Sequence, residues 1–129
     1  MNDSRSRILI VDDDEALCGL IELWLQSSYE VSVENDGQKA LETMRTNRPD
    51  VAVLDVMMPR LSGIELASKV RGDPELRDTP LLFMSAYHAI LEPHEREAIR
   101  PYGLLSKPFS REQLVARIEE ILRLRRAQA

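Results

Sequence analysis

The segment 51–55, Val-Ala-Val-Leu-Asp, constrains the fold of this chain more than any other part of the sequence. Its four apolar residues form a run too short for a stable helix, and such a run is typical of a strand buried on both faces of a parallel sheet. Pro59 and Gly63 follow and force the chain to turn. In an open α/β sheet the carboxyl ends of the strands form the crevice where ligands bind. Asp55 is therefore either a site residue or only a cap for the turn that follows.

Four further apolar runs alternate with amphipathic segments along the chain. The runs predict strands at 8–11, 29–33, 80–84 and 103–106. The segments predict helices after Glu15, at 38–45, from Ser62 or Gly63 to 71, at 89–100 and after Ser110, which is a good N-cap. Pro93 begins or breaks the fourth of these helices. In the first helix, the expected buried face is Leu17, Leu20, Ile21 and Trp24. Alternation of this kind implies right-handed crossovers and a parallel sheet covered on both faces. We therefore expect an α/β fold, a doubly wound, flavodoxin-like five-stranded parallel sheet with strand order 2-1-3-4-5 and helices on both faces.

Length and composition fit one globular domain over 1–129. We expect residues 1–7 to fray and read 123–129 as a helix end or the start of a linker. No apolar run approaches the ~20 residues of a membrane span, and the N-terminus lacks a signal-peptide core. The single cysteine, Cys18, is expected to be a buried structural thiol, which suits a reducing cytoplasm.

The net charge of −5 argues against nonspecific binding of nucleic acid by this domain. Arg123, Arg125 and Arg126 form a local basic cluster. Cations at the end of a helix complement its macrodipole, so we interpret these arginines as helix-end residues.

Polar side chains stand where four of the predicted strands end. Asp12 and Asp13 follow the strand 8–11, and Asp55, Ser85 and Lys107 follow later strands. In the expected strand order, neighbouring strands are ~4.8 Å apart, so these five side chains can converge on one pocket. Clustered carboxylates without His or Cys favour a hard cation such as Mg²⁺. Asp55 is the candidate nucleophile for phosphoryl transfer, and Lys107 and Ser85 are candidates for stabilising the phosphoryl oxygens.

In combination, these motifs resemble those of receiver domains of two-component response regulators, including single-domain chemotaxis regulators. The motifs are Asp12-Asp13, Leu54-Asp-Val-Met-Met-Pro59 with Gly63, Ser85-Ala86 and Lys107-Pro-Phe109. The resemblance implies that Asp55 accepts a phosphoryl group from a histidine kinase or a phosphotransfer protein. It implies that Asp13, Asp55 and the backbone carbonyl of Met57 bind Mg²⁺ directly, with Asp12 binding through water. It also implies a switch role for the Ser85 hydroxyl, a phosphate contact for Lys107 and a cis Lys107–Pro108 bond.

The function implied by the resemblance is a cytoplasmic, phosphorylation-activated signalling switch that has no external substrate and so is not an enzyme in the usual sense. The expected output face is the predicted helix 89–100, strand 103–106 and the helix after Ser110. It is expected to bind a downstream effector or a covalently linked output domain, and self-association on phosphorylation is one further use. No direct contact with nucleic acid or membrane is expected.

One position departs from the pattern of the resembling family. Leu104 stands where the family usually has Tyr or Phe, and the segment 100–103 differs from the usual loop. Leucine has less bulk and no hydroxyl, so we expect the switch to be carried mainly by the segment 86–93. Tyr87 and Tyr102 are the aromatic side chains that can substitute.

Two other readings compete with the switch. The first is a hydrolase that turns over phosphate esters through an aspartyl intermediate. Common aspartate phosphatases carry Asp-x-Asp at the strand end, whereas position 57 here is methionine. The second is a receiver-like scaffold that is never phosphorylated, and the complete set of acids, hydroxyl and lysine argues against it.

Overall fold

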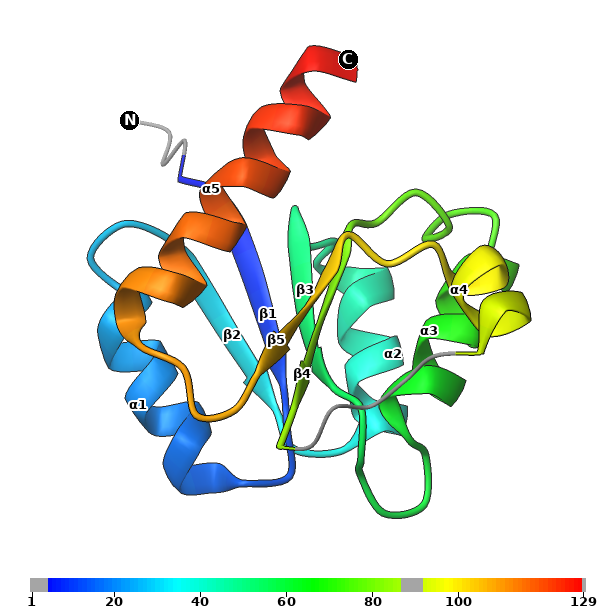
Figure 1. Ribbon diagram of the computed structural model, residues 1–129, viewed down its shortest axis with the longest axis horizontal. Coiled ribbons are helices and arrows are strands. Elements are labelled where there is room, and N and C mark those ends of the chain that lie inside the picture. Colours follow the sequence, from blue (N-terminus) through cyan, green and yellow to red (C-terminus); the bar gives the residue numbers. More distant parts are fainter. Residues whose placement is uncertain (1–4, 87–91, 129) are drawn as a thin grey trace.

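The structure is a computed structural model, and it describes residues 5–86 and 92–128. Within these ranges, strands and helices alternate along the chain (Figure 1). The strands are β1 Arg7–Val11, β2 Glu30–Glu34, β3 Val51–Asp55, β4 Leu81–Ser85 and β5 Gly103–Ser106. The helices are α1 Glu15–Leu25, α2 Gly37–Thr46, α3 Gly63–Gly72, α4 Pro93–Ile99 and α5 Arg111–Gln128. Residues 89–91 of the fourth predicted helix lie outside the described ranges, and α4 begins at Pro93.

The strands form one parallel sheet in the order β2-β1-β3-β4-β5, which confirms the predicted topology. All residues of β3 are buried, because β1 and β4 pair with it on both edges and helices cover both faces of the sheet (Figure 1). Its branched aliphatic side chains suit a strand packed on both faces. The carboxyl ends of the strands meet at the lower edge of the sheet in Figure 1. We call this edge the carboxyl edge and the opposite one the amino edge.

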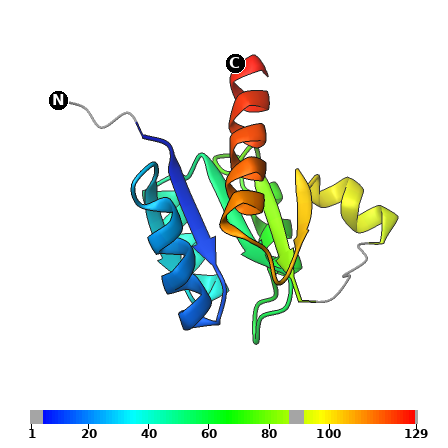
Figure 2. The same ribbon diagram turned by 60° about the vertical axis from the view of Figure 1, so that its left-hand side comes forward.

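Helices cover both faces of the sheet, as predicted (Figures 1 and 2). Helices α1 and α5 lie on one face, while α2 and α3 lie on the other, with α4 beside α3. Each face has its own apolar core, and alternate residues of the central strands contribute to each. The C-terminal turns of α5 project beyond the amino edge of the sheet (Figure 2).

Short polar residues fix the starts of the helices. Asp14 caps α1, Asp36 caps α2, and Ser62 forms a reciprocal capping box with Glu65 at the start of α3. The predicted cap of the last helix is confirmed, since Gln113 N–H donates to Ser110 Oγ at 3.1 Å. By fixing where each helix begins, these caps also fix where the preceding loops at the carboxyl edge end.

The predicted buried face of α1 is partly wrong. Its buried residues are Cys18, Ile21 and Leu25, whereas Leu20 is 44% exposed. Leu17 and Trp24 are only partly buried. The helix is rotated so that the sheet covers the stripe that contains Cys18, which leaves the leucine-rich stripe at the surface. Cys18 is buried, as predicted.

Candidate functional site

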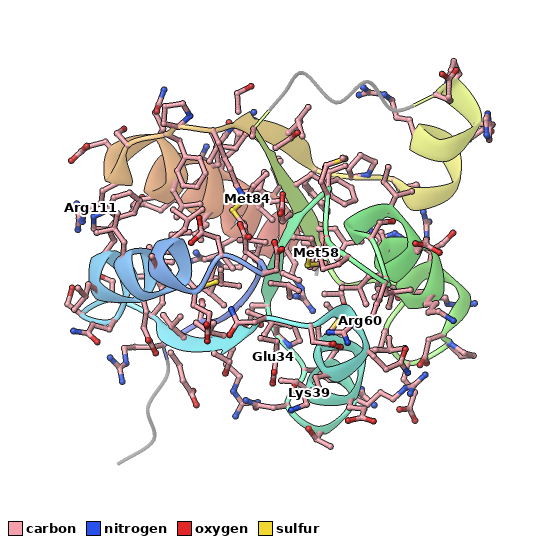
Figure 3. The ribbon with its side chains drawn as sticks, turned by 90° about the horizontal axis from the view of Figure 1, so that it is seen from below. Glu34, Lys39, Met58, Arg60, Met84 and Arg111 are labelled. Atoms are coloured by element: carbon pink, nitrogen blue, oxygen red, sulfur yellow. The ribbon has the colours of Figure 1, made fainter. Side chains whose placement is uncertain are left out.

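Three carboxylates meet at the carboxyl edge, which Figure 3 shows from below. Asp12 and Asp13 follow β1 and Asp55 ends β3, and one oxygen from each lies within 4.8 Å of the others. Asp12 is fully buried, Asp55 is 5% exposed, and Asp13 is exposed. The parallel pairing of β1 with β3 brings these residues together across more than forty positions of sequence. The sequence predicted this convergence.

Lys107 reaches the same carboxylates from the end of β5. Its Nζ lies 2.7 Å from Asp12 Oδ2 and 3.5 Å from Asp55 Oδ1. The backbone N–H of Lys107 donates to the carbonyl of Ser85 at 2.7 Å. This bond ties the lysine to the end of β4. The Lys107–Pro108 peptide bond is cis, as predicted.

Burial dominates the electrostatics of Asp55. Desolvation and the charge of Asp12 raise the pKa of Asp55 to about 6, against the lowering effects of Lys107 and of the Met57 backbone N–H. Burial alone lowers the pKa of Lys107, but its hydrogen bond to Asp12 and the charges of Asp12 and Asp55 raise it overall. The lysine therefore stays charged at neutral pH, and the carboxylates crowd around it.

Ser85 is fully buried at the end of β4, next to the end of β3 in the sheet. The side chains of Met58 and Met84 lie near the centre of the view in Figure 3. Met57 has a side chain that is 68% exposed, and its backbone N–H hydrogen-bonds Asp55. That its carbonyl binds a metal stays a prediction.

The loop between β3 and α3 is held close to the acidic cluster. A Cβ on Gly63 would lie 2.0 Å from the carbonyl oxygen of Asp55, so only glycine fits there. Gly63 N–H donates to the carbonyl of Val56 at 3.0 Å. Arg60 has a φ of 68° in this loop, and its guanidinium lies 3.3 Å from Asp36 Oδ2. The loop is thereby attached to the start of α2.

Asn35 is a site residue that the sequence reasoning missed. Its Nδ2 donates to the carbonyl oxygen of Asp12 at 2.7 Å and lies 3.5 Å from Cys18 Sγ. Asp12 Oδ1 in turn accepts the backbone N–H of Asp14 at 2.9 Å. In the sequence, Asn35-Asp-Gly37 is a strong turn signal, which does not by itself indicate a site residue, although the end of β2 lies directly beside the end of β1 in the predicted strand order. The predicted adjacency of these two strand ends was the signal that Asn35 could lie beside Asp12.

Leu104 is partly buried and packs against the core on the face of α2 and α3. Tyr102 packs against the core of the opposite face, so it does not occupy the place of an aromatic residue at position 104. Tyr87, the other candidate substitute, lies outside the described residues, as does most of the segment 86–93.

Comparison with known protein families identifies the family to which this chain belongs. The model of the response regulator receiver domain matches residues 8–119. The chain belongs to the response regulator receiver family. The general function of receiver domains is that of a phosphorylation-activated switch in two-component signalling, and they are phosphoacceptors rather than enzymes in the usual sense.

Relatives of this receiver domain include the response regulators MprA of two mycobacteria. The chain is 39% identical to MprA of Mycobacterium tuberculosis and 41% identical to that of Mycobacterium leprae, over 118 residues in each case. These matches cover 91% of this chain but 50% and 51% of the relatives. The chain therefore spans about half the length of the curated relatives it matches.

Solved structures agree with this assignment. The chemotaxis protein CheY4 of Vibrio cholerae superposes with a TM-score of 0.85 at 30% identity, covering 92% of this chain and 99% of that one. A CheY-like receiver domain protein of Methanospirillum hungatei has a TM-score of 0.88 at 24% identity, covering 98% and 100%, and it shows the fold alone. Among the described residues of the receiver domain, no helix is both long and apolar enough to cross a membrane.

Proposed function

We propose that Asp55 of this receiver domain accepts a phosphoryl group from the phosphohistidine of a histidine kinase or of a phosphotransfer protein. The observation that carries the proposal is the placement of Asp55, which is buried at the end of the central strand within 3.5 Å of Lys107 Nζ. A carboxylate oxygen of Asp55 attacks the phosphorus, the P–N bond breaks, and the imidazole leaves with the electron pair.

The three carboxylates fit a hard divalent cation, since each offers an oxygen within 4.8 Å of the others and, among the described residues, no His or Cys ligand joins the group. Asp13, Asp55 and the carbonyl of Met57 would hold Mg²⁺ directly, with Asp12 acting through water. Bound Mg²⁺ would supply positive charge that offsets the negative charge of the phosphoryl oxygens. The fit to Mg²⁺ is inferred from the carboxylate oxygens that the chain provides at this site.

Lys107 supplies a second positive charge next to Asp55. On phosphorylation, we infer that its ammonium exchanges part of its contact with Asp12 for a phosphoryl oxygen. The Ser85 hydroxyl donates to another phosphoryl oxygen from the neighbouring strand. The movement of these two residues would link the chemistry to β4, β5 and the helices beside them.

We propose α4, β5 and α5 as the output face, which binds a downstream effector or a covalently linked output domain in the cytoplasm. Self-association through this face on phosphorylation is part of the proposal. Sizing of the beryllofluoride-treated protein across a concentration series tests it, because a monomer at every concentration removes the self-association.

A labelling assay tests the phosphoacceptor and separates it from the two alternatives. The protein is incubated with Mg²⁺ and acetyl phosphate, and we expect an acid-stable, base-labile adduct without release of phosphate from unrelated esters. Ester turnover would indicate the hydrolase. The absence of any adduct would indicate the scaffold that is never phosphorylated.

A further inference from the structure

A second candidate site lies at the amino edge of the sheet, on the opposite side of the molecule from Asp55. It is a cavity of about 590 Å³ at the junction of the α3–β4 loop, the α4–β5 link and the end of α5. Figure 1 shows α5 projecting past this edge of the sheet. Four arginines line the cavity, namely Arg71 near the end of α3, Arg77 in the α3–β4 loop, Arg100 in the α4–β5 link and Arg125 in α5.

The charge of this cavity is opposite to that of the whole chain. Asp78 is the one carboxylate among its lining residues, so four guanidinium groups face one acid. The complete chain carries a net charge of −5. Like charges at short range repel each other unless an anion or solvent screens them. This concentration of guanidinium groups therefore favours an anionic ligand.

Arg71 holds the frame of the cavity. Its Nη1 donates to the carbonyls of Arg77 and Thr79 at 2.7 Å each, and its Nη2 donates to the carbonyl of Arg100 at 3.1 Å. Burial and the nearby charge of Arg100 lower the pKa of Arg71. Because one partly buried guanidinium bonds to both segments, the backbones of Arg77 and Arg100 are preorganised beside each other. Preorganisation reduces the entropy cost of binding.

Arg77 and Arg100 are the arginines best placed to bind. Both are exposed, and their backbones are fixed by Arg71. Arg125 donates to the carbonyl of Asp50 at 2.8 Å and lies 3.8 Å from Asp50 Oδ1, so part of its charge is already compensated. Arg125 therefore lines the cavity from α5 but is less available to bind a ligand than Arg77 and Arg100.

We propose that this cavity binds a small organic molecule that carries two or more phosphoryl groups. Guanidinium groups bind phosphate oxygens in a bidentate manner, and several converging arginines suit several such groups. The volume lies within the range of about 300–1,000 Å³ that is typical of small-ligand sites and exceeds the need of one phosphate. Pro101 and Tyr102 add ring surface for an organic moiety. The site is independent of the phosphorylation of Asp55.

Calorimetry with ATP and with inorganic tripolyphosphate tests the proposal in buffer stripped of divalent ions by a chelating resin. Without metal, the acidic carboxyl edge repels both probes. We expect both to bind and their amide NMR shifts to centre on residues 76–80 and 100–103. ATP should bind more tightly because Tyr102 can contact its base. Shifts centred on Asp12 and Asp55, or tighter binding of citrate or of a poly-glutamate peptide, would overturn the assignment.

Charge variants provide the matched controls. The double variant Arg77→Gln with Arg100→Gln should weaken tripolyphosphate binding by about tenfold or more, and Asp78→Asn should tighten it several-fold. The double variant Arg111→Gln with Arg123→Gln removes the same two charges from exposed positions on α5 outside the cavity and should change affinity less than about twofold. Equal weakening by this pair would overturn the site. The double variant of Arg77 and Arg100 should still be labelled by acetyl phosphate, which separates this proposal from the phosphoacceptor role.

Discussion

Lys107 and Asp12 form the closest ion pair at the carboxyl edge, with 2.7 Å between Nζ and Oδ2, although 95 positions separate them in sequence. Asp12 is fully buried, and the ammonium of Lys107 compensates the charge of its carboxylate. Asp55 lies farther from the lysine, at 3.5 Å. The lysine thus stabilises the acidic cluster before any phosphoryl group arrives.

Replacing Lys107 with Gln should lower the free energy of unfolding by about 3 kcal/mol in metal-free buffer, because two buried carboxylates lose their counter-charge. Mg²⁺ should restore part of the loss, since the cation replaces that charge. Urea unfolding with and without Mg²⁺ measures both effects. Lys107→Arg serves as the control that keeps the charge. An equal loss in both buffers would contradict the role assigned to the lysine.

The raised pKa of Asp55 predicts a pH-dependent stability. Between the ordinary value of 3.8 and about 6, the unfolded chain loses the Asp55 proton while the folded chain retains it. The contribution of Asp55 to the free energy of unfolding therefore falls as pH rises through this window. Asp55→Asn lacks this titration. In metal-free buffer, its free energy of unfolding minus that of wild type should therefore grow by up to about 2 kcal/mol from pH 4 to 6 and then stay constant.

Urea unfolding of both proteins across this pH range, in metal-free buffer, measures the difference. Asp50→Asn is a suitable control, because Asp50 is only partly buried and lies at the amino edge. A difference between Asp55→Asn and wild type that does not change with pH would mean that Asp55 is not desolvated.

Gly63→Ala should lower the free energy of unfolding by about 3 kcal/mol or more, because the new Cβ would lie 2.0 Å from the carbonyl oxygen of Asp55. The variant should therefore unfold at a lower urea concentration than wild type. Gly19→Ala is the matched control. Nothing lies within 4 Å of its new Cβ, and Gly19 is inside α1, so alanine should stabilise the helix by about 1 kcal/mol. Equal effects of the two changes would show that the close approach at Gly63 does not limit the loop.

Asp13→Ala should weaken Mg²⁺ binding by about tenfold or more, because it removes the exposed carboxylate of the cluster that a cation reaches first. Glu15→Gln changes the charge equally at an exposed position in the first turn of α1 and should have a small effect. Trp24 fluorescence or calorimetry reports binding. Normal binding by Asp13→Ala would remove Asp13 from the metal site.

The sequence predicted the sheet because its signals were local and agreed with one another. The run 51–54 is apolar throughout and forms a strand buried on both faces. The alternation of helices with strands indicated a doubly wound parallel sheet, and its flavodoxin-like form has the strand order that is observed. The buried stripe of α1 was less accessible to this reasoning. Leu20 and Cys18 are both apolar, so helical spacing alone did not indicate which of them faces the sheet.

The acidic cluster could be predicted because the topology brings the strand ends together. The strand order alone does not predict which side chains contact each other there. Strand spacing places Lys107 within reach of Asp55, but only the packed side chains show that Asp12 is its closer partner. The arginine cavity was missed for a similar reason. Arg125 was interpreted as a helix-end cation, and its neighbours Arg71, Arg77 and Arg100 come from other segments.

The most direct test of the phosphoacceptor role is chemical mapping of the modified residue. Protein treated with acetyl phosphate and Mg²⁺ is reduced with borohydride, which converts an aspartyl phosphate to homoserine, and its peptides are analysed by mass spectrometry. We predict homoserine at Asp55, and none in Asp55→Asn or in protein kept free of Mg²⁺. Homoserine at Asp12, Asp13 or Asp14 in the native protein, with Asp55 unmodified, would contradict the account.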